Sequence, residues 1–103
     1  MNKSSIIDEC IKFRENDVKY FLDNIKNINM NADLKIDLIR RINKIYFIIG
    51  NKESIKDYYS FMILFQNILK DADKKYRPTK FKPIEELSND DISKEQLEKL
   101  TIF

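Results

Sequence analysis

Apolar residues recur at steps of three and four along most of this chain, which is the repeat of a helix that buries one side. The chain has only one glycine and two prolines among 103 residues, so few positions interrupt that repeat. No segment alternates apolar and polar residues in the manner of a half-buried strand. The pattern therefore predicts an all-α fold, a small antiparallel bundle of three long helices with one or two short C-terminal helices.

The bounds of the long helices follow from the apolar stripes and from the residues that interrupt them. The expected helices cover about residues 6–28, 32–49 and 52–76. Gly50 stands where a residue that ends a helix belongs, and Asn51 can cap the next helix. A connection this short predicts antiparallel neighbours.

The C-terminal part of the chain has a different composition. Pro78 ends the third helix, and residues 77–82 form a basic linker with three cations. Residues 83–103 carry two basic and six acidic groups, and we expect short helical turns there, with Ser93 and Gln96 as a capping box. We expect residues 1–103 to form a single helical domain.

Composition excludes most kinds of catalytic site. The chain has no histidine, which excludes the Ser–His and Cys–His pairs of nucleophilic enzymes and the commonest metal ligand. A single cysteine cannot build a structural zinc site, and a single glycine cannot build a phosphate-binding loop. Cys10 lies within an apolar stripe, which is typical of a small buried residue. We expect a protein that is not an enzyme and that binds neither metal nor cofactor.

The apolar runs are short, and an acidic pair follows the first two isoleucines. Ile45–Ile49 and Phe61–Phe65 fall far short of the roughly 20 residues that span a bilayer. The N-terminus has no apolar core of a signal peptide, so we expect a cytoplasmic protein. Lysine, asparagine and isoleucine supply 15, 10 and 17 residues, which indicates an AT-rich genome such as that of a phage, a plasmid or a low-GC bacterium.

Residues 58–69, with the sequence YYSFMILFQNIL, are apolar nearly all round the expected third helix. Such a helix is either the centre of a well-filled core or the carrier of a partner-binding face, and both interpretations remain open. Self-association through this helix would satisfy both. The candidate partner-binding residues on this apolar face are Tyr58, Phe61, Phe65, Phe13 and Tyr20.

The end of the third helix and the linker mix cations with aromatic residues. Cations could neutralise phosphates and aromatic rings could stack on unpaired bases, which predicts contact with nucleic acid. The alternative is that the cations favour a helix C-terminus and that Phe81 holds the linker on the core. The acidic segment 83–103 could also mask the basic stretch. The candidate nucleic-acid contacts are Lys74, Lys75, Tyr76, Arg77, Lys80, Phe81, Lys82, Arg40 and Arg41.

The overall plan resembles the bacteriocin immunity proteins of Gram-positive bacteria, and Ile92–Leu100 looks like the start of their last helix. This resemblance implies a cytoplasmic four-helix bundle. The expected third helix is also loosely similar to that of the small helical subunits of type III CRISPR effectors. We expect a non-enzymatic protein that binds a macromolecular partner stoichiometrically, most simply a protein, as an anti-CRISPR-like inhibitor of host defence or an immunity factor. The alternative is a nucleic-acid-binding accessory subunit that uses residues 74–82.

Overall fold

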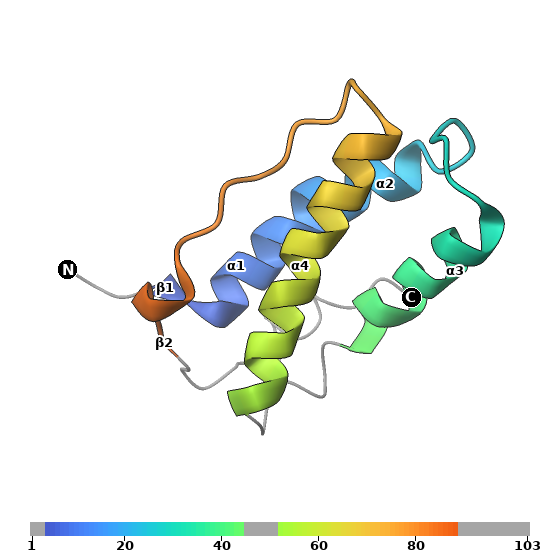
Figure 1. Cartoon of the computed structure of the whole chain (residues 1–103). Helices are drawn as coiled ribbons and strands as arrows, with labels where there is room; N and C mark the ends of the chain where they lie inside the picture. The colour runs from blue at the N-terminus through green and yellow to red at the C-terminus, as the bar shows by residue number, and fades with distance from the viewer. Residues whose placement is uncertain (1–3, 45–51, 89–103) are drawn as a thin grey trace.

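The computed structural model describes residues 4–44 and 52–88, and these confirm the all-α expectation (Figure 1). Helical structure runs without a break from Ile6 to Asp23, but it is not one regular helix. It consists of α1 (Ile6–Lys12), a π-helical segment (Phe13–Val18) and α2 (Lys19–Asp23). We call this stretch the first helix.

Two regular helices pack against the first helix. α3 (Ala32–Ile42) begins where the sequence predicts, because the side chain of Asn31 accepts a hydrogen bond from the Leu34 N–H at 2.7 Å. α4 (Lys52–Ala72) is the longest helix and crosses in front of the first helix in Figure 1. α3 lies to the right of α4 in this view. Together they form a small helical bundle.

The chain beyond α4 turns back along the bundle. Residues 74–83, which we call the strap, have neither helix nor strand and run from the end of α4 towards the N-terminus (Figure 1). A 3₁₀ turn, Ile84–Glu86, follows the strap. Strand β2 (Leu87–Ser88) then pairs in parallel with β1 (Ser4–Ser5), a two-residue pairing too short to leave a strand pattern in the sequence.

The first helix and α4 end earlier than their stripes predict, and local polar contacts explain both ends. The first helix stops at Asp23, not at residue 28, because the Asn24 side-chain amide donates to the Tyr20 carbonyl at 2.8 Å and the chain turns. α4 stops at Ala72, not at residue 76, because Asp73 accepts the Lys75 N–H at 2.9 Å and forms a turn. The apolar stripe continues beyond the end of the helix because residues in the turn, such as Ile28, are also buried in the core.

The expected second helix is only partly described. α3 is α-helical to Ile42, and residues 43–44 form a 3₁₀ turn. The rest of the expected helix, Gly50 and Asn51 lie outside the described residues, as do the expected capping box and Ile92–Leu100. The short turn expected after Pro83 is present, with the Glu86 N–H bonded to the Pro83 carbonyl at 2.9 Å.

Aromatic rings fill the centre of the core. Phe13 is fully buried and packs edge-on against Phe65, with ring centroids 5.1 Å apart, and also contacts the rings of Tyr58, Phe61 and Phe81. Edge-to-face pairs of this kind add to the stabilisation that burial provides. Cys10 is buried as predicted, and burial raises the pKa of its thiol to about 12.

Candidate functional site

The residues predicted to form an apolar partner-binding face lie in the core. Phe13 and Phe65 are fully buried, and Phe61 and Tyr58 are only 5% and 6% exposed. Tyr20 is half-buried and packs against the Tyr76 ring. A partner could not reach the four buried rings without opening the bundle. This placement corrects the expectation of a face, because the rings are needed to fill a small core.

The π-helical segment explains why Phe13 lies inside. The sequence repeat places Phe13 off the main stripe of the first helix. Within the segment, however, two adjacent pairs are buried, Phe13 with Arg14 and Asp17 with Val18. A π turn closes hydrogen bonds five residues apart and so inserts one extra residue, which rotates the following turn. This rotation lets both members of each pair face the interior.

Asp17 forms the centre of a buried polar cluster beneath the strap. Its side chain is fully buried, and its two carboxylate oxygens accept three hydrogen bonds. The Tyr76 hydroxyl and the Thr79 N–H donate to Oδ1, the latter at 3.2 Å, and the Gln66 amide donates to Oδ2 at 3.3 Å. A buried carboxylate is tolerated only with such partners. We call Asp17, Gln66, Tyr76 and Thr79 the latch.

Further contacts hold the strap on the helices. The Gln66 amide also donates to the Thr79 carbonyl at 2.7 Å, and the Tyr59 hydroxyl donates to the Lys82 carbonyl. The Phe81 ring contacts both Phe13 and Tyr59, at centroid distances of 6.2 and 6.3 Å. The strap is therefore bound to both the first helix and α4 along its length.

A hydrogen bond also holds Asp73, the residue that precedes the strap. The Tyr20 hydroxyl donates to Asp73 Oδ2 at 2.5 Å, and this hydrogen bond lowers the pKa of the Asp73 carboxyl and raises the pKa of Tyr20. The pKa of Tyr76 is raised, first by burial and then by its hydrogen bond to Asp17. Both tyrosines therefore stay protonated at neutral pH and act as hydrogen-bond donors.

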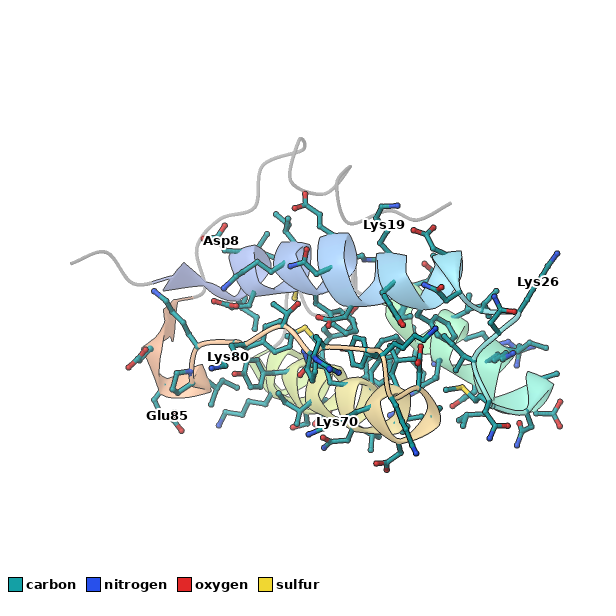
Figure 2. The ribbon with its side chains drawn as sticks, turned by 90° about the horizontal axis from the view of Figure 1, so that it is seen from above. Asp8, Lys19, Lys26, Lys70, Lys80 and Glu85 are labelled. Atoms are coloured by element: carbon teal, nitrogen blue, oxygen red, sulfur yellow. The ribbon has the colours of Figure 1, made fainter. Side chains whose placement is uncertain are left out.

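Every exposed charged side chain of the strap is a cation. Figure 2 shows the strap between α1 and α4, with Lys80 labelled beside it. Ion pairs seen within residues 4–44 and 52–88 join Lys12 to Glu9 and Lys19 to Asp23, and involve no strap cation. The exposed cations of the strap are Lys74, Lys75, Arg77, Lys80 and Lys82.

The predicted nucleic-acid contacts thus separate into three groups. The five cations share one exposed segment, whereas Tyr76 and Phe81 face the interior and are not available for stacking on a base. Arg40 and Arg41 lie on α3, across α4 from the strap in Figure 1. The Arg41 guanidinium lies over the Phe61 ring, 4.8 Å from its centroid.

The predicted site residues do not include Asp17, Gln66 and Arg14, three of the polar residues that are buried. Arg14 donates to the Ile42 carbonyl at 3.0 Å and so joins the first helix to the end of α3. Their spacing is the signal in the sequence. Arg14 and Asp17 follow Cys10 by four and seven residues, which is the spacing of one helix face that also includes the buried Phe21. Polar residues at such positions indicate a buried polar contact.

A shallow groove of about 380 Å³ opens between α4 and the start of α3. Its apolar walls are formed by Met30 and Leu34 on one side and by Ile68 and Ala72 on the other. Asn29, Asn31 and Asp71 add a polar rim. All four apolar residues are half-buried, so the groove exposes part of each.

Within the described part of the chain, no cluster of three or more histidine, cysteine, aspartate or glutamate side chains is placed to hold a metal ion. None of the helices described is both long enough and apolar enough to cross a membrane. No protein-family model, no curated protein and no solved structure matches this chain.

Proposed function

We propose that this protein is a non-enzymatic binding protein that contacts nucleic acid through the strap. One observation supports this proposal above all others. The strap presents five exposed cations, while its inward side chains hold it on the bundle. The backbone that carries the cations is therefore held in place before a ligand arrives, which reduces the ordering cost of binding.

The chemistry of the exposed side favours a polyanion. Lysine and arginine side chains that neutralise phosphates release condensed counterions, which is the main source of affinity in non-specific nucleic-acid binding. A protein interface of ordinary type would instead centre on exposed aromatic and apolar side chains. Here the rings of Phe13, Phe61, Phe65 and Tyr58 are buried and cannot form such a centre. The large apolar side chains exposed in the described part of the chain are Ile36, Ile63 and Leu64, and none of them is aromatic.

The test is a titration of labelled single-stranded and duplex oligonucleotides, followed by fluorescence anisotropy at several salt concentrations. We expect measurable binding at low salt that weakens steeply as salt increases. The variant Lys80→Glu should weaken binding by about tenfold or more, because it both removes a cation and adds a repelling charge.

A matched control separates the effect of losing a strap cation from the effect of changing the net charge. Lys26 is exposed and lies well away from Lys80 in Figure 2, and Lys26→Glu changes the net charge by the same amount. We expect this control to bind within about twofold of the original protein. Equal losses in the two variants, or no binding to any oligonucleotide, would contradict the proposal.

A protein partner is the second candidate function, and the groove beside α4 supports it. A stoichiometric inhibitor of host defence or an immunity factor would need a surface for a protein, and the groove offers partly exposed apolar side chains. The test is capture from a bacterial lysate after nuclease treatment. Binding through the groove requires that Ile68→Lys abolish the captured complex and that Lys80→Glu leave it intact.

A further inference from the structure

We infer that the strap binds the phosphate backbone of a nucleic-acid strand without stacking on its bases, over about five nucleotides. This inference rests on the proposed function and specifies what the strap contacts. It follows from the way the strap divides its side chains between two sides. Rings and hydrogen-bonding groups face the bundle, and charges face solvent.

Both aromatic residues of the strap are occupied by the bundle. Tyr76 is 2% exposed and its hydroxyl donates to Asp17, so its ring cannot turn outward without breaking the latch. Phe81 is half-buried and contacts the rings of Phe13 and Tyr59. Proteins that hold single strands commonly stack bases on exposed aromatic rings. The strap offers no such ring.

The outward side chains suit phosphates better than base edges. Four of the five cations are lysines, which act as point charges and carry little directional information. Arg77 could recognise a guanine through bidentate hydrogen bonds. Its Nη1 already donates, however, to the carbonyls of Lys74 and Tyr76, at 2.9 and 3.2 Å. The side chain that could recognise a base is therefore partly engaged by its own backbone.

The number of strap cations sets the size of the site. Each of the five exposed cations can neutralise one phosphate. A strand carries one phosphate per nucleotide, so full neutralisation corresponds to about five nucleotides. We expect affinity to increase with strand length up to about that size and to increase only slowly beyond it.

The experiment compares a thymine strand with an abasic strand of the same length, using the unmodified protein. Backbone binding predicts equal dissociation constants within about twofold, because each strand carries the same phosphates. Stacking would favour the thymine strand by about fivefold or more for each stacked base. A thymine preference of that size would overturn the inference while leaving the proposed function in place.

The salt dependence gives a second, independent readout. With no more than five strap cations neutralising phosphates, the slope of log affinity against log salt for single strands should be no steeper than about −3.5. A steeper slope would show that cations outside the strap take part and would overturn the site assigned here. Failure of both strands to bind would instead reject the proposed function itself.

Discussion

The two sides of the strap differ in almost every physical respect. The inner side consists of Tyr76, Thr79 and Phe81, which bond to or pack against two helices. The outer side carries five cations and two prolines, and no ion pair seen among the described residues engages these cations. The comparison shows how a segment without regular structure can hold a fixed position, since side-chain contacts replace the backbone hydrogen bonds that a helix or strand would supply. It also separates the residues that determine stability from those proposed to bind.

The largest expected effect on stability comes from removing the centre of the latch. Asp17→Ala leaves three buried donors without their acceptor, from Tyr76, Thr79 and Gln66, and we expect it to lower the free energy of unfolding by about 3 kcal/mol. Chemical denaturation followed by circular dichroism measures this change. Glu15 lies in the same π-helical segment but is exposed, so Glu15→Ala should stay within about 0.5 kcal/mol of the original protein. Similar losses in both variants would show that Asp17 has no special role.

A smaller effect is expected from one member of the latch. Tyr76→Phe removes a single hydroxyl and keeps the ring, and we expect it to cost about 1.5 kcal/mol at neutral pH. Because the pKa of Tyr76 is raised in the folded protein, the unfolded chain loses its proton first as pH increases. The hydroxyl's contribution is therefore complete below the ordinary tyrosine pKa of 10.0 and is lost as pH rises above it.

This pH dependence tests whether the Tyr76 hydroxyl is buried and hydrogen-bonded in the folded protein. Denaturation curves measured on both sides of the ordinary tyrosine pKa should show a steeper loss of stability for the original protein than for Tyr76→Phe. Tyr58, whose pKa burial also raises, contributes to both curves and so cancels in the comparison. Identical slopes for the two proteins would contradict the raised pKa of Tyr76, which burial and the hydrogen bond to Asp17 produce together.

The smallest effect on stability is expected on the outer side. Lys80→Gln combined with Lys82→Gln removes two exposed charges, and we expect the free energy of unfolding to change by no more than about 0.5 kcal/mol. For the same variant, the slope of log affinity against log salt for single-stranded DNA should be less steep by about 1.4, because each cation that neutralises a phosphate contributes about 0.7. A large loss of stability would show that these lysines help to hold the strap, and the distinction between its two sides would fail.

The sequence could predict that the fold is helical, but it could not predict the path of the chain where polar residues interrupt the apolar pattern. The stripe of the first helix correctly places Cys10 and Phe21 in the core. It fails for Phe13, because a constant helical repeat cannot represent a π turn. For the site, the sequence identified all five strap cations and left open whether Phe81 packs on the core, but it could not decide that Tyr76 and Phe81 face inward. That outcome depends on contacts with Asp17 and Phe13, which are about sixty residues away along the chain.

The sequence by itself determined the all-α class, the start of α3 at about residue 32 and the cluster of cations that follows α4, because these depend on neighbours within a few positions. Tertiary structure alone decided that the rings of Phe61 and Phe65 fill the core and that the strap lies back across two helices. The physical reason is that burial is a property of the packed bundle. A local repeat shows which residues can face inward, but only the other helices and the strap decide which of them are covered.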